Sequence, residues 1–395
     1  MTRVVDRGVR AGPQLIRAMN EQLLLGHIRS TTAVSRAELA RRTGLSKPTV
    51  SLALANLEAA GLVQASGVRT GTPGPNAVLY EVRPDAGYVL ALDVGRVYLR
   101  GAISDVAGTV RVRDTMVTRA KSRRGRIAEL TRLADRMCAS VGVTRAEITQ
   151  AVLGSPGVYD PGRDALSLAA ALEGWEHADL VPGLRTVFGE SLMIENDVDA
   201  AALAELAHGH GREVESFAFV SIGTGIGMGL VLDGTLRRGA HGAAGEIAYL
   251  PLETADADPE DVRRRGGLEA AASAGGIVYA AHRAGLDVDS AREVFAAAAA
   301  GDERAREVVA AEAVVVARAI CAVVAVIDPA LVVLGGGIGK ASGLIDAVRF
   351  ALDDLSPVPT DIRVSALGVE SVVDGCLVSG LDRAWTALTA RTPGA

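Results

Sequence analysis

The sequence predicts an α/β protein of two or three domains, with a small helical domain at its N-terminus. The first 82 residues show helices separated by a short glycine turn, and the rest alternates apolar strand-like runs with segments of helical spacing. Two glycine-rich loops interrupt the second half, at residues 223–229 and 239–245. A length of 395 residues with 49% apolar residues supplies sizeable cores.

The formal net charge of −6 is unevenly spread along the chain. Residues 1–80 hold ten Lys and Arg against four Asp and Glu, whereas the remaining residues hold 31 basic and 43 acidic side chains. A basic head on an acidic body predicts that the head contacts a polyanion such as DNA. No apolar run approaches the ~20 residues of a membrane span, and the N-terminus lacks an apolar signal core, so we expect a cytoplasmic protein with no membrane contact.

The three cysteines, Cys138, Cys321 and Cys376, lie far apart on apolar segments. This spacing builds neither a disulfide framework nor a local Cys-x-x-Cys metal site. We expect buried, inert thiols.

The N-terminal segment predicts a helix-turn-helix. Residues 16–28 have apolar residues at helical spacing. Ser35 with Glu38 three residues later forms a capping-box pattern that starts a second helix. Gly44 makes the tight turn, and Ser46 caps a third helix that ends near residue 61.

The third helix has two predicted faces. Val50, Leu54 and Leu57 form its core stripe, and a polar stripe lies opposite, with donors suited to base edges and phosphates. Any solvated helix face is also polar, so this helix alone leaves both interpretations open. A hairpin over residues 62–80 completes a winged helix, with its tip at 69–76. The predicted DNA contacts are Arg36, Ser46, Lys47, Thr49, Ser51, Asn56, Arg69 and Thr72.

The body is organised around residues 217–249. A buried strand leads into Gly223-Thr224-Gly225-Ile226-Gly227 and then into a second strand. Glycine at every second position lets backbone N–H groups approach an anion, phosphate above all, although such hairpins also serve only to turn the chain. The second glycine-rich loop carries one lone carboxylate, Glu246.

These motifs, in this order, resemble the ROK family of sugar kinases and transcriptional repressors, which share the actin/hexokinase-type ATPase fold. The resemblance covers nearly the whole chain. It implies a winged helix-turn-helix at residues 1–82 and a ROK sugar-kinase-like domain at 88–395. Two lobes, about 88–210 and 214–395, would repeat one order of strands and helices and hold the ligand cleft between them. Periodicity alone gives only the α/β class.

The resemblance also implies site residues. Asp197 stands where ROK kinases place the general base and Asn196 where they bind another hydroxyl; Glu246 and Glu269 match further sugar contacts. Asn196 and Asp197 also fit an Asx turn that caps the next helix. The nucleotide-like loops are Asp93 and Gly95, then Gly223, Thr224 and Gly225, then Gly335 and Gly336, although helix–strand packing also favours the last two glycines.

Two family motifs are degraded in this chain. Where ROK kinases have Asp-x-Gly-Gly-Thr-Lys, the sequence reads Asp93-Val94-Gly95-Arg96-Val97-Tyr98, and a bulky side chain there excludes a close phosphate cradle. The family's zinc-binding histidine and cysteine motif are absent, and acids and arginines occupy residues 256–265. We therefore expect no metal, and a solvated charged loop in that place.

The sequence thus predicts a transcriptional regulator, of the repressor type, that binds double-stranded operator DNA and responds to a carbohydrate or derivative in a kinase-like cleft. It would have neither catalytic activity nor a cofactor. The alternative is an active ATP-dependent sugar kinase with Asp197 as catalytic base. A nucleotide-independent interaction protein would fit if no sugar binds. We expect a homodimer or homotetramer, in which lobe closure changes the half-site spacing that the heads can span.

Overall fold

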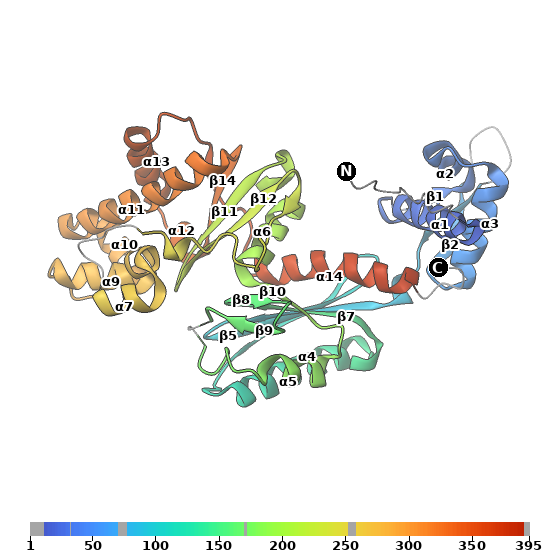
Figure 1. Cartoon of the computed structure of the whole chain (residues 1–395), viewed down its shortest axis with the longest axis horizontal. Helices are drawn as coiled ribbons and strands as arrows, with labels where there is room; N and C mark the ends of the chain where they lie inside the picture. Colours follow the sequence, from blue (N-terminus) through green and yellow to red (C-terminus); the bar gives the residue numbers. More distant parts are fainter. Residues whose placement is uncertain (1–11, 32, 70–76, 170–171, 252–257, 391–395) are drawn as a thin grey trace, which may run out of the picture.

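The computed structural model describes residues 12–31, 33–69, 77–169, 172–251 and 258–390. Within these ranges the chain forms an N-terminal head and two α/β lobes (Figure 1).

The head is a winged helix, as predicted. Its elements are α1 (Pro13–Arg29), β1 (Val34–Ser35), α2 (Arg36–Thr43), α3 (Lys47–Ala59), β2 (Val63–Arg69) and β3 (Ala77–Val82), with sheet order β1-β3-β2. The capping box of Ser35 and Glu38 is present at the start of α2. Gly44 ends that helix with a φ of 71°, and Ser46 accepts the Thr49 N–H at 3.3 Å. The local cap and turn signals therefore set the helix boundaries.

Lobe 1 is a five-stranded sheet between two helical layers. Its strands are β4 (Tyr88–Val94), β5 (Tyr98–Asp105), β6 (Val110–Val117), β7 (Ile148–Ser155) and β10 (Met193–Asn196), in the order β10-β7-β4-β5-β6. Helices α4 (Arg123–Val141) and α5 (Leu180–Phe188) cover one face, whereas α6 (Asp197–His208) and α14 (Ser371–Ala390) pack against the other. A short hairpin of β8 (Val158–Asp160) and β9 (Ala165–Ser167) lies beside the sheet.

Lobe 2 repeats this plan. Strands β11 (Phe217–Ile222), β12 (Ile226–Leu232), β13 (Thr235–Leu236), β14 (Leu331–Gly335) and β15 (Ile362–Val364) take the order β13-β12-β11-β14-β15. In the sheet of each lobe, the first three strands along the chain pair antiparallel, and two later strands pair in parallel on the other side of the first strand. This shared arrangement confirms the predicted duplication. The remaining helices are α7 (Pro259–Arg265), α8 (Gly267–Ala272), α9 (Ala274–Arg283), α10 (Ala291–Ala300), α11 (Glu303–Ile327), α12 (Gly336–Gly339) and α13 (Leu344–Leu355).

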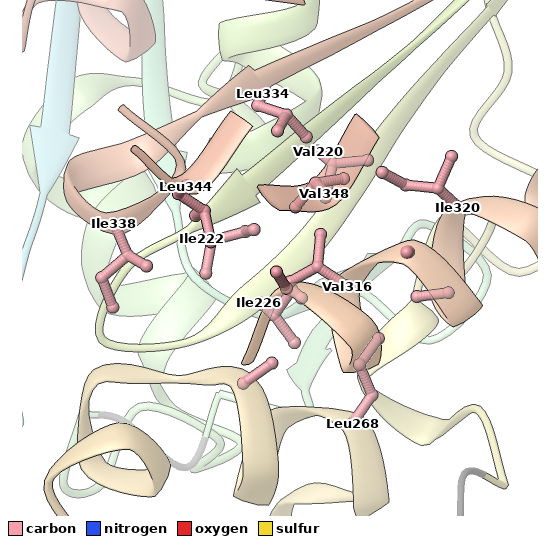
Figure 2. Packing of buried hydrophobic residues seen from close by; sticks show 14 of the residues in the cluster. Val220, Ile222, Ile226, Leu268, Val316, Ile320, Leu334, Ile338, Leu344 and Val348 are labelled. Atoms are coloured by element: carbon pink, nitrogen blue, oxygen red, sulfur yellow. The ribbon is translucent and has the colours of Figure 1, made fainter. Parts of the chain in front are cut away.

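The core of lobe 2 forms where the strands meet α11 and α13. Figure 2 shows Val220 and Ile226 of the sheet near Val316 and Ile320 of α11, all buried. By length and composition alone α11 could cross a membrane, and it is the one helix of the described ranges that passes this test. Its buried face belongs to the lobe 2 core, so it packs as a core helix.

The C-terminal helix α14 departs from the predicted lobe limits. The sequence placed residues 214–395 in lobe 2, but α14 packs on β4, β7 and α6 of lobe 1 (Figure 1). Nothing local in the sequence indicates this return, because it depends on which face of lobe 1 is left uncovered. At Gly375 an added Cβ would lie 1.6 Å from the Ala200 carbonyl oxygen of α6, so the two helices touch backbone to backbone.

The far end of α14 meets the head. The Arg29 guanidinium lies 5.2 Å from the centre of the Trp385 ring and 3.1 Å from Asp382 Oδ1. Trp385 is buried and donates its indole N–H to the Val106 carbonyl at 2.9 Å. One hydrophobic cluster runs from the core of the head through α14 to the lobe 1 sheet. The head is therefore packed on α14 rather than tethered by a free linker.

The contact between α6 and α14 predicts different outcomes for two helical glycines. Gly375→Ala should lower the free energy of unfolding by about 1 to 3 kcal/mol, because the methyl group meets a carbonyl that cannot move independently of its helix. Gly26→Ala in α1 is the matched control, since nothing lies within 4 Å of its added Cβ. That change should stabilise the protein by about 0.5 to 1 kcal/mol. Denaturant unfolding measures both, and equal effects of the two changes would contradict the close contact.

Candidate functional site

A cleft of about 480 Å³ opens between the two lobes. It is lined by the start of α6 from lobe 1 and by the β11–β12 turn, the loop at Glu246 and helix α8 from lobe 2. All four residues predicted to bind ligand, Asn196, Asp197, Glu246 and Glu269, line this one cleft. The fold thus brings together side chains from three separate segments, 196–197, 246 and 269.

The lobe 1 wall is the N-terminus of α6. Asn196 caps the helix: its Oδ1 accepts the N–H groups of Val198 at 2.9 Å and Asp199 at 3.0 Å, and its amide donates to the Gly157 carbonyl at 3.1 Å. Asn196 therefore forms the helix cap that was predicted as its alternative role. Asp197 follows as the first helical residue and accepts the Val198 N–H at 2.9 Å. The cap fixes where Asp197 stands in the cleft.

The lobe 2 wall holds two carboxylates in different roles. Glu269 Oε2 accepts the Ile226 N–H at 3.1 Å, and Arg265 lies 3.3 Å from its other oxygen. A Cβ at Gly225 would come within 2.8 Å of Glu269, which explains that glycine. Glu269 thus holds the glycine-rich turn in place. Glu246 is half-buried directly before a short 3-10 turn (Ile247–Tyr249).

The cleft carboxyls hold their protons more tightly than ordinary carboxyls. Burial raises the pKa of Asp197 to about 6, and the nearby Glu269 adds to the shift. Burial also raises the pKa of Glu246 to about 7, helped by the charges of Asp197 and Glu269. Near neutral pH the site therefore contains both proton donors and acceptors, a combination suited to hydroxyl groups.

Asp199 is a cleft residue that the sequence analysis missed. It is 4% exposed, and its Oδ1 has no hydrogen-bond partner among the described residues. Burial raises its pKa to about 8, and the charge of Glu195 adds to this. Glu195 itself is held by Arg238, whose Nε and Nη2 lie 2.8 and 2.5 Å from its oxygens. The sequence does show Asp199 as a second acidic residue in the first turn of α6. The burial of this side chain could not be predicted, because it depends on tertiary packing.

The nucleotide-like loops divide into two groups. Gly223, Thr224 and Gly225 line the cleft, whereas Asp93, Gly95, Gly335 and Gly336 are not among its lining residues. Asp93 is buried and pairs with Arg100 at 3.2 Å, and burial raises its pKa to about 7.

Local packing accounts for the other three glycines. The Gly95 N–H closes a tight turn onto the Tyr98 carbonyl at 3.0 Å. Gly335 packs against the Phe219 ring, and Gly336 has a φ of 75° close to the Ile222 carbonyl.

The segment that replaces the zinc motif is not wholly a solvated loop, which corrects the sequence expectation. Residues 259–265 form helix α7 and bring Arg264 and Arg265 to the cleft, while 252–257 lie outside the described residues. No group of three or more His, Cys, Asp or Glu side chains within the described ranges is placed to hold a metal ion. The donors around the cleft do not fit tetrahedral zinc, because neither Cys nor His is among its described lining residues.

The exposed face of α3 differs from the predicted polar stripe. Lys47 and Ser51 are exposed, but Leu52 and Ala55 are exposed beside them, with Leu52 at 52%. An exposed apolar side chain on such a helix suits the methyl group of thymine.

The other predicted α3 contact residues are less accessible. Thr49 is half-buried and its hydroxyl lies 2.8 Å from that of the capping residue Ser46. Asn56 is also half-buried and donates to Glu21 of α1 at 2.6 Å. These side chains would have to exchange protein partners for DNA.

The predicted arginines of the head are paired within the protein. Arg36 donates to the Tyr80 hydroxyl and lies 5.1 Å from the centre of that ring. Arg69 lies 2.9 Å from Glu38 Oε1, and hydrogen bonds from Ser35 and Arg69 lower the Glu38 pKa to about 2. Thr72 lies outside the described residues.

Residues 89–366, which include both sheets and the cleft, match the model of the ROK family. The chain belongs to the ROK family. A second model, that of the MarR family, matches residues 21–70 of the head. The ROK domain thus carries the cleft, and a MarR-type winged helix precedes it, so DNA binding and transcription regulation are the activities that this combination indicates.

Kinases and a transcriptional regulator are both similar to this chain. An N-acetylmannosamine kinase of Salmonella heidelberg is 33% identical over 283 residues, which cover 70% of this chain and 92% of the kinase. A ROK transcriptional regulator homologous to the MLC protein of E. coli superposes with a TM-score of 0.77 at 21% identity, covering 96% of this chain and 99% of the regulator. A ROK hexokinase of Thermus thermophilus superposes with a TM-score of 0.64 at 27% identity, covering 76% and 99% of the two chains.

The Asp199 carboxyl, whose Oδ1 has no hydrogen-bond partner among the described residues, predicts a pH-dependent stability. In the folded protein the pKa of Asp199 is about 8, above the ordinary value of an aspartate. The contribution of this carboxyl to the free energy of unfolding is therefore fully present in acid and is lost as the pH rises through 8. Asp199→Asn cannot ionise and should raise the midpoint of thermal unfolding at about pH 8.5, with no such gain near pH 4. Asp353→Asn, at an exposed position of α13, is the control. An equal effect of Asp199→Asn at both pH values would argue against a buried Asp199 that ionises near pH 8.

Proposed function

We propose that this ROK protein is a transcriptional repressor that binds operator DNA through its winged helix and responds to a carbohydrate or derivative in the cleft. The observation that supports this proposal is the continuous packing from the cleft through α6 and α14 to the winged helix. The cleft lies at the N-terminus of α6, α6 touches α14 at Gly375, and α14 carries the head through Trp385 and Asp382. A ligand that moves α6 would therefore move the platform on which the head rests.

The ligand chemistry is proposed from the cleft walls. Asp197 and Glu246 line the cleft with raised pKa values of about 6 and 7, so each is close to a balance between a protonated and an ionised carboxyl. Such groups both donate to and accept from sugar hydroxyls. A buried polar site of this kind discriminates between ligands, because each unmet partner costs about 1 to 3 kcal/mol.

The proposed regulator acts as a homodimer or homotetramer. Winged helices read two half-sites when two heads are held at a fixed separation, and lobe closure would change that separation. The charges of the two parts fit contact of the heads with DNA, since the head is basic and the body acidic.

Sugar phosphorylation is the second candidate function. Asp197 lines the cleft at the start of a helix with a pKa of about 6, which suits a general base, and the N-acetylmannosamine kinase relative is 33% identical. Against it stands Arg96, which lines the cleft in the turn where the family's kinases carry glycine. Sugar-dependent ADP production distinguishes the two functions.

The first prediction of this proposal concerns the effector response. Asp197→Ala should abolish or strongly weaken the effect of the cleft ligand on operator binding, because a hydroxyl contact is lost. Operator affinity without ligand should remain near that of the parent, since Asp197 does not contact the head. Fluorescence anisotropy on labelled operator measures both, with the monosaccharide or derivative that most raises the thermal midpoint as ligand.

Asp353→Ala, at an exposed position of α13, serves as control for this experiment. Release of DNA by Asp197→Ala at the parent's ligand concentration would contradict the proposed cleft. ADP production that requires sugar and is removed by Asp197→Ala would instead establish the kinase.

The second prediction concerns the DNA surface. Lys47→Ala should weaken operator binding by about 1 to 3 kcal/mol, the loss expected for a contact to a base edge. Arg69→Ala should reduce the salt dependence of operator binding by about one unit of slope, the loss expected for a contact to phosphate. Lys121→Ala, on an exposed segment of the body, is the control and should leave affinity unchanged. Operator DNA selected from a random library provides the ligand. Full affinity and unchanged sequence preference in Lys47→Ala combined with Leu52→Ser would remove α3 from its reading role.

A further inference from the structure

Helix α1 of the head exposes an apolar stripe on the side away from its core face. Four side chains with exposed fractions of 43–57% form this α1 stripe: Leu15, Ile16, Met19 and Leu23. The helical period directs them away from Leu24 and Ile28, which are fully buried in the core of the head. A surface helix normally carries polar residues on that side. The head therefore has a second apolar face, which its own core does not use.

A glycine continues the α1 stripe toward the body. Gly26 lies three residues after Leu23 and seven after Met19, which places it on the same side of the helix. Glycine lowers helix stability relative to alanine, and here neither crowding nor a left-handed φ requires it, since nothing lies within 4 Å of an added Cβ. A bare backbone on a helix surface permits close approach of another helix, as Gly375 does between α14 and α6.

The surface beside Gly26 is hollowed. A groove of about 380 Å³ lies between α1 and α14, with Gln22, Gly26, Thr386 and Thr389 among its lining residues. One wall of this groove belongs to the head, and the other belongs to the helix that connects the head with lobe 1. Contacts made at this end of the α1 stripe therefore depend on how α14 holds the head.

The small area of the α1 stripe indicates what kind of partner it fits. Four side chains of this size and exposure offer roughly 300–400 Å² of apolar surface, whereas a stable interface buries about 800 Å² per partner. A freely diffusing protein would bind such a surface only weakly. A partner that is already held nearby by another connection binds it well, because its effective concentration is high. The second head of a homo-oligomer is such a partner.

The residue pattern also suits a second copy of the same helix. Ile16, Met19 and Leu23 follow the three-four spacing with which two helices pack against each other. Asn20 and Gln22 border the α1 stripe and carry no charge, so two copies can approach about a two-fold axis without repulsion between like charges at these positions. The flexible Met19 side chain at the centre can adapt to its own copy.

We propose that the α1 stripe joins the two heads of an oligomer, with α1 of one chain packed against α1 of a second copy. This inference rests on the proposed function, in which two heads read two half-sites. Paired heads hold their two α3 helices at one separation, which fixes the half-site spacing that the oligomer reads. A cleft ligand that shifts α14 changes the groove beside the α1 stripe, and a contact of this small area is weak enough to be broken by such a shift.

Cysteine cross-linking of the full-length protein tests the contact. Met19→Cys lies at the centre of the α1 stripe, and Arg17→Cys, exposed on the same helix but off the stripe, is the matched control. Both also carry Cys321→Ser, because the other two native cysteines are buried. On selected operator DNA with two half-sites, oxidation should link Met19→Cys chains into covalent dimers at least tenfold faster than Arg17→Cys chains.

DNA binding provides a second measurement. Met19→Asp places two like charges across the contact, so it should weaken binding to DNA with two half-sites by about tenfold or more. Binding to a single half-site should stay within about twofold, because α3 is unchanged. Met19→Leu should behave as the parent. Gly26→Ala should also weaken two-site binding, although the isolated head tolerates the methyl group. Thermal unfolding verifies that each variant is folded.

The outcomes separate this inference from the proposed function. Equal cross-linking of Met19→Cys and Arg17→Cys, or an equal loss by Met19→Asp on one and two half-sites, would overturn the contact between heads and leave the winged helix and the cleft as proposed. Slow reaction of Met19→Cys with maleimide and no covalent dimer would mean that another segment, such as residues 1–11, covers the α1 stripe, and would also overturn it. Failure of the parent to bind any selected DNA would overturn the proposed function itself.

Discussion

The contact between α6 and α14 is the constraint on which the rest of this structure depends. Gly375 allows the backbone of α14 to lie against the Ala200 carbonyl of α6, and both helices cover the same face of the lobe 1 sheet. Because protein interiors are close-packed, a shift of one helix must be accommodated by the other. The start of α6 forms a wall of the cleft, while the end of α14 supports the head through Trp385. This pair of helices thus connects the cleft with the head.

The electrostatics of the cleft complement this geometry. Three of its carboxyl groups, Asp197, Asp199 and Glu246, have raised pKa values because they are buried near one another. Ionised carboxylates are costly at such positions, since buried charges are poorly solvated and Asp199 has an oxygen without a described partner. A ligand that satisfies these groups stabilises the arrangement that it binds, and this is the energy available to change the position of α6.

The sequence was most informative where structure is determined locally. The capping box at Ser35, the turn at Gly44 and the glycine-rich hairpin at 223–225 each lie where they were expected, because caps and turns depend on residues within one or two helical turns. The family resemblance placed Asn196 and Asp197 at the start of a helix beside the cleft, which the structure also shows.

What the sequence could not predict depends on contacts between distant segments. The position of α14 on lobe 1 follows from which sheet face is uncovered, not from its own pattern. The burial of Asp199, the pairing of Asn56 with Glu21 and the approach of Arg264 to the cleft likewise arise only in the folded chain. Sequence spacing identifies side chains able to bind a ligand, but it does not show which of them already have partners.

The central claim is that occupation of the cleft is transmitted to the head through α6 and α14. Hydrogen–deuterium exchange on the full-length protein, with and without a saturating cleft ligand, tests it most directly, because amide protection reports local opening along each helix. The account predicts altered exchange in residues 197–208, in 371–390 and at the end of α1 around Arg29. Changes confined to the cleft segments around Glu246 and Glu269, with α14 and α1 unaltered, would contradict it.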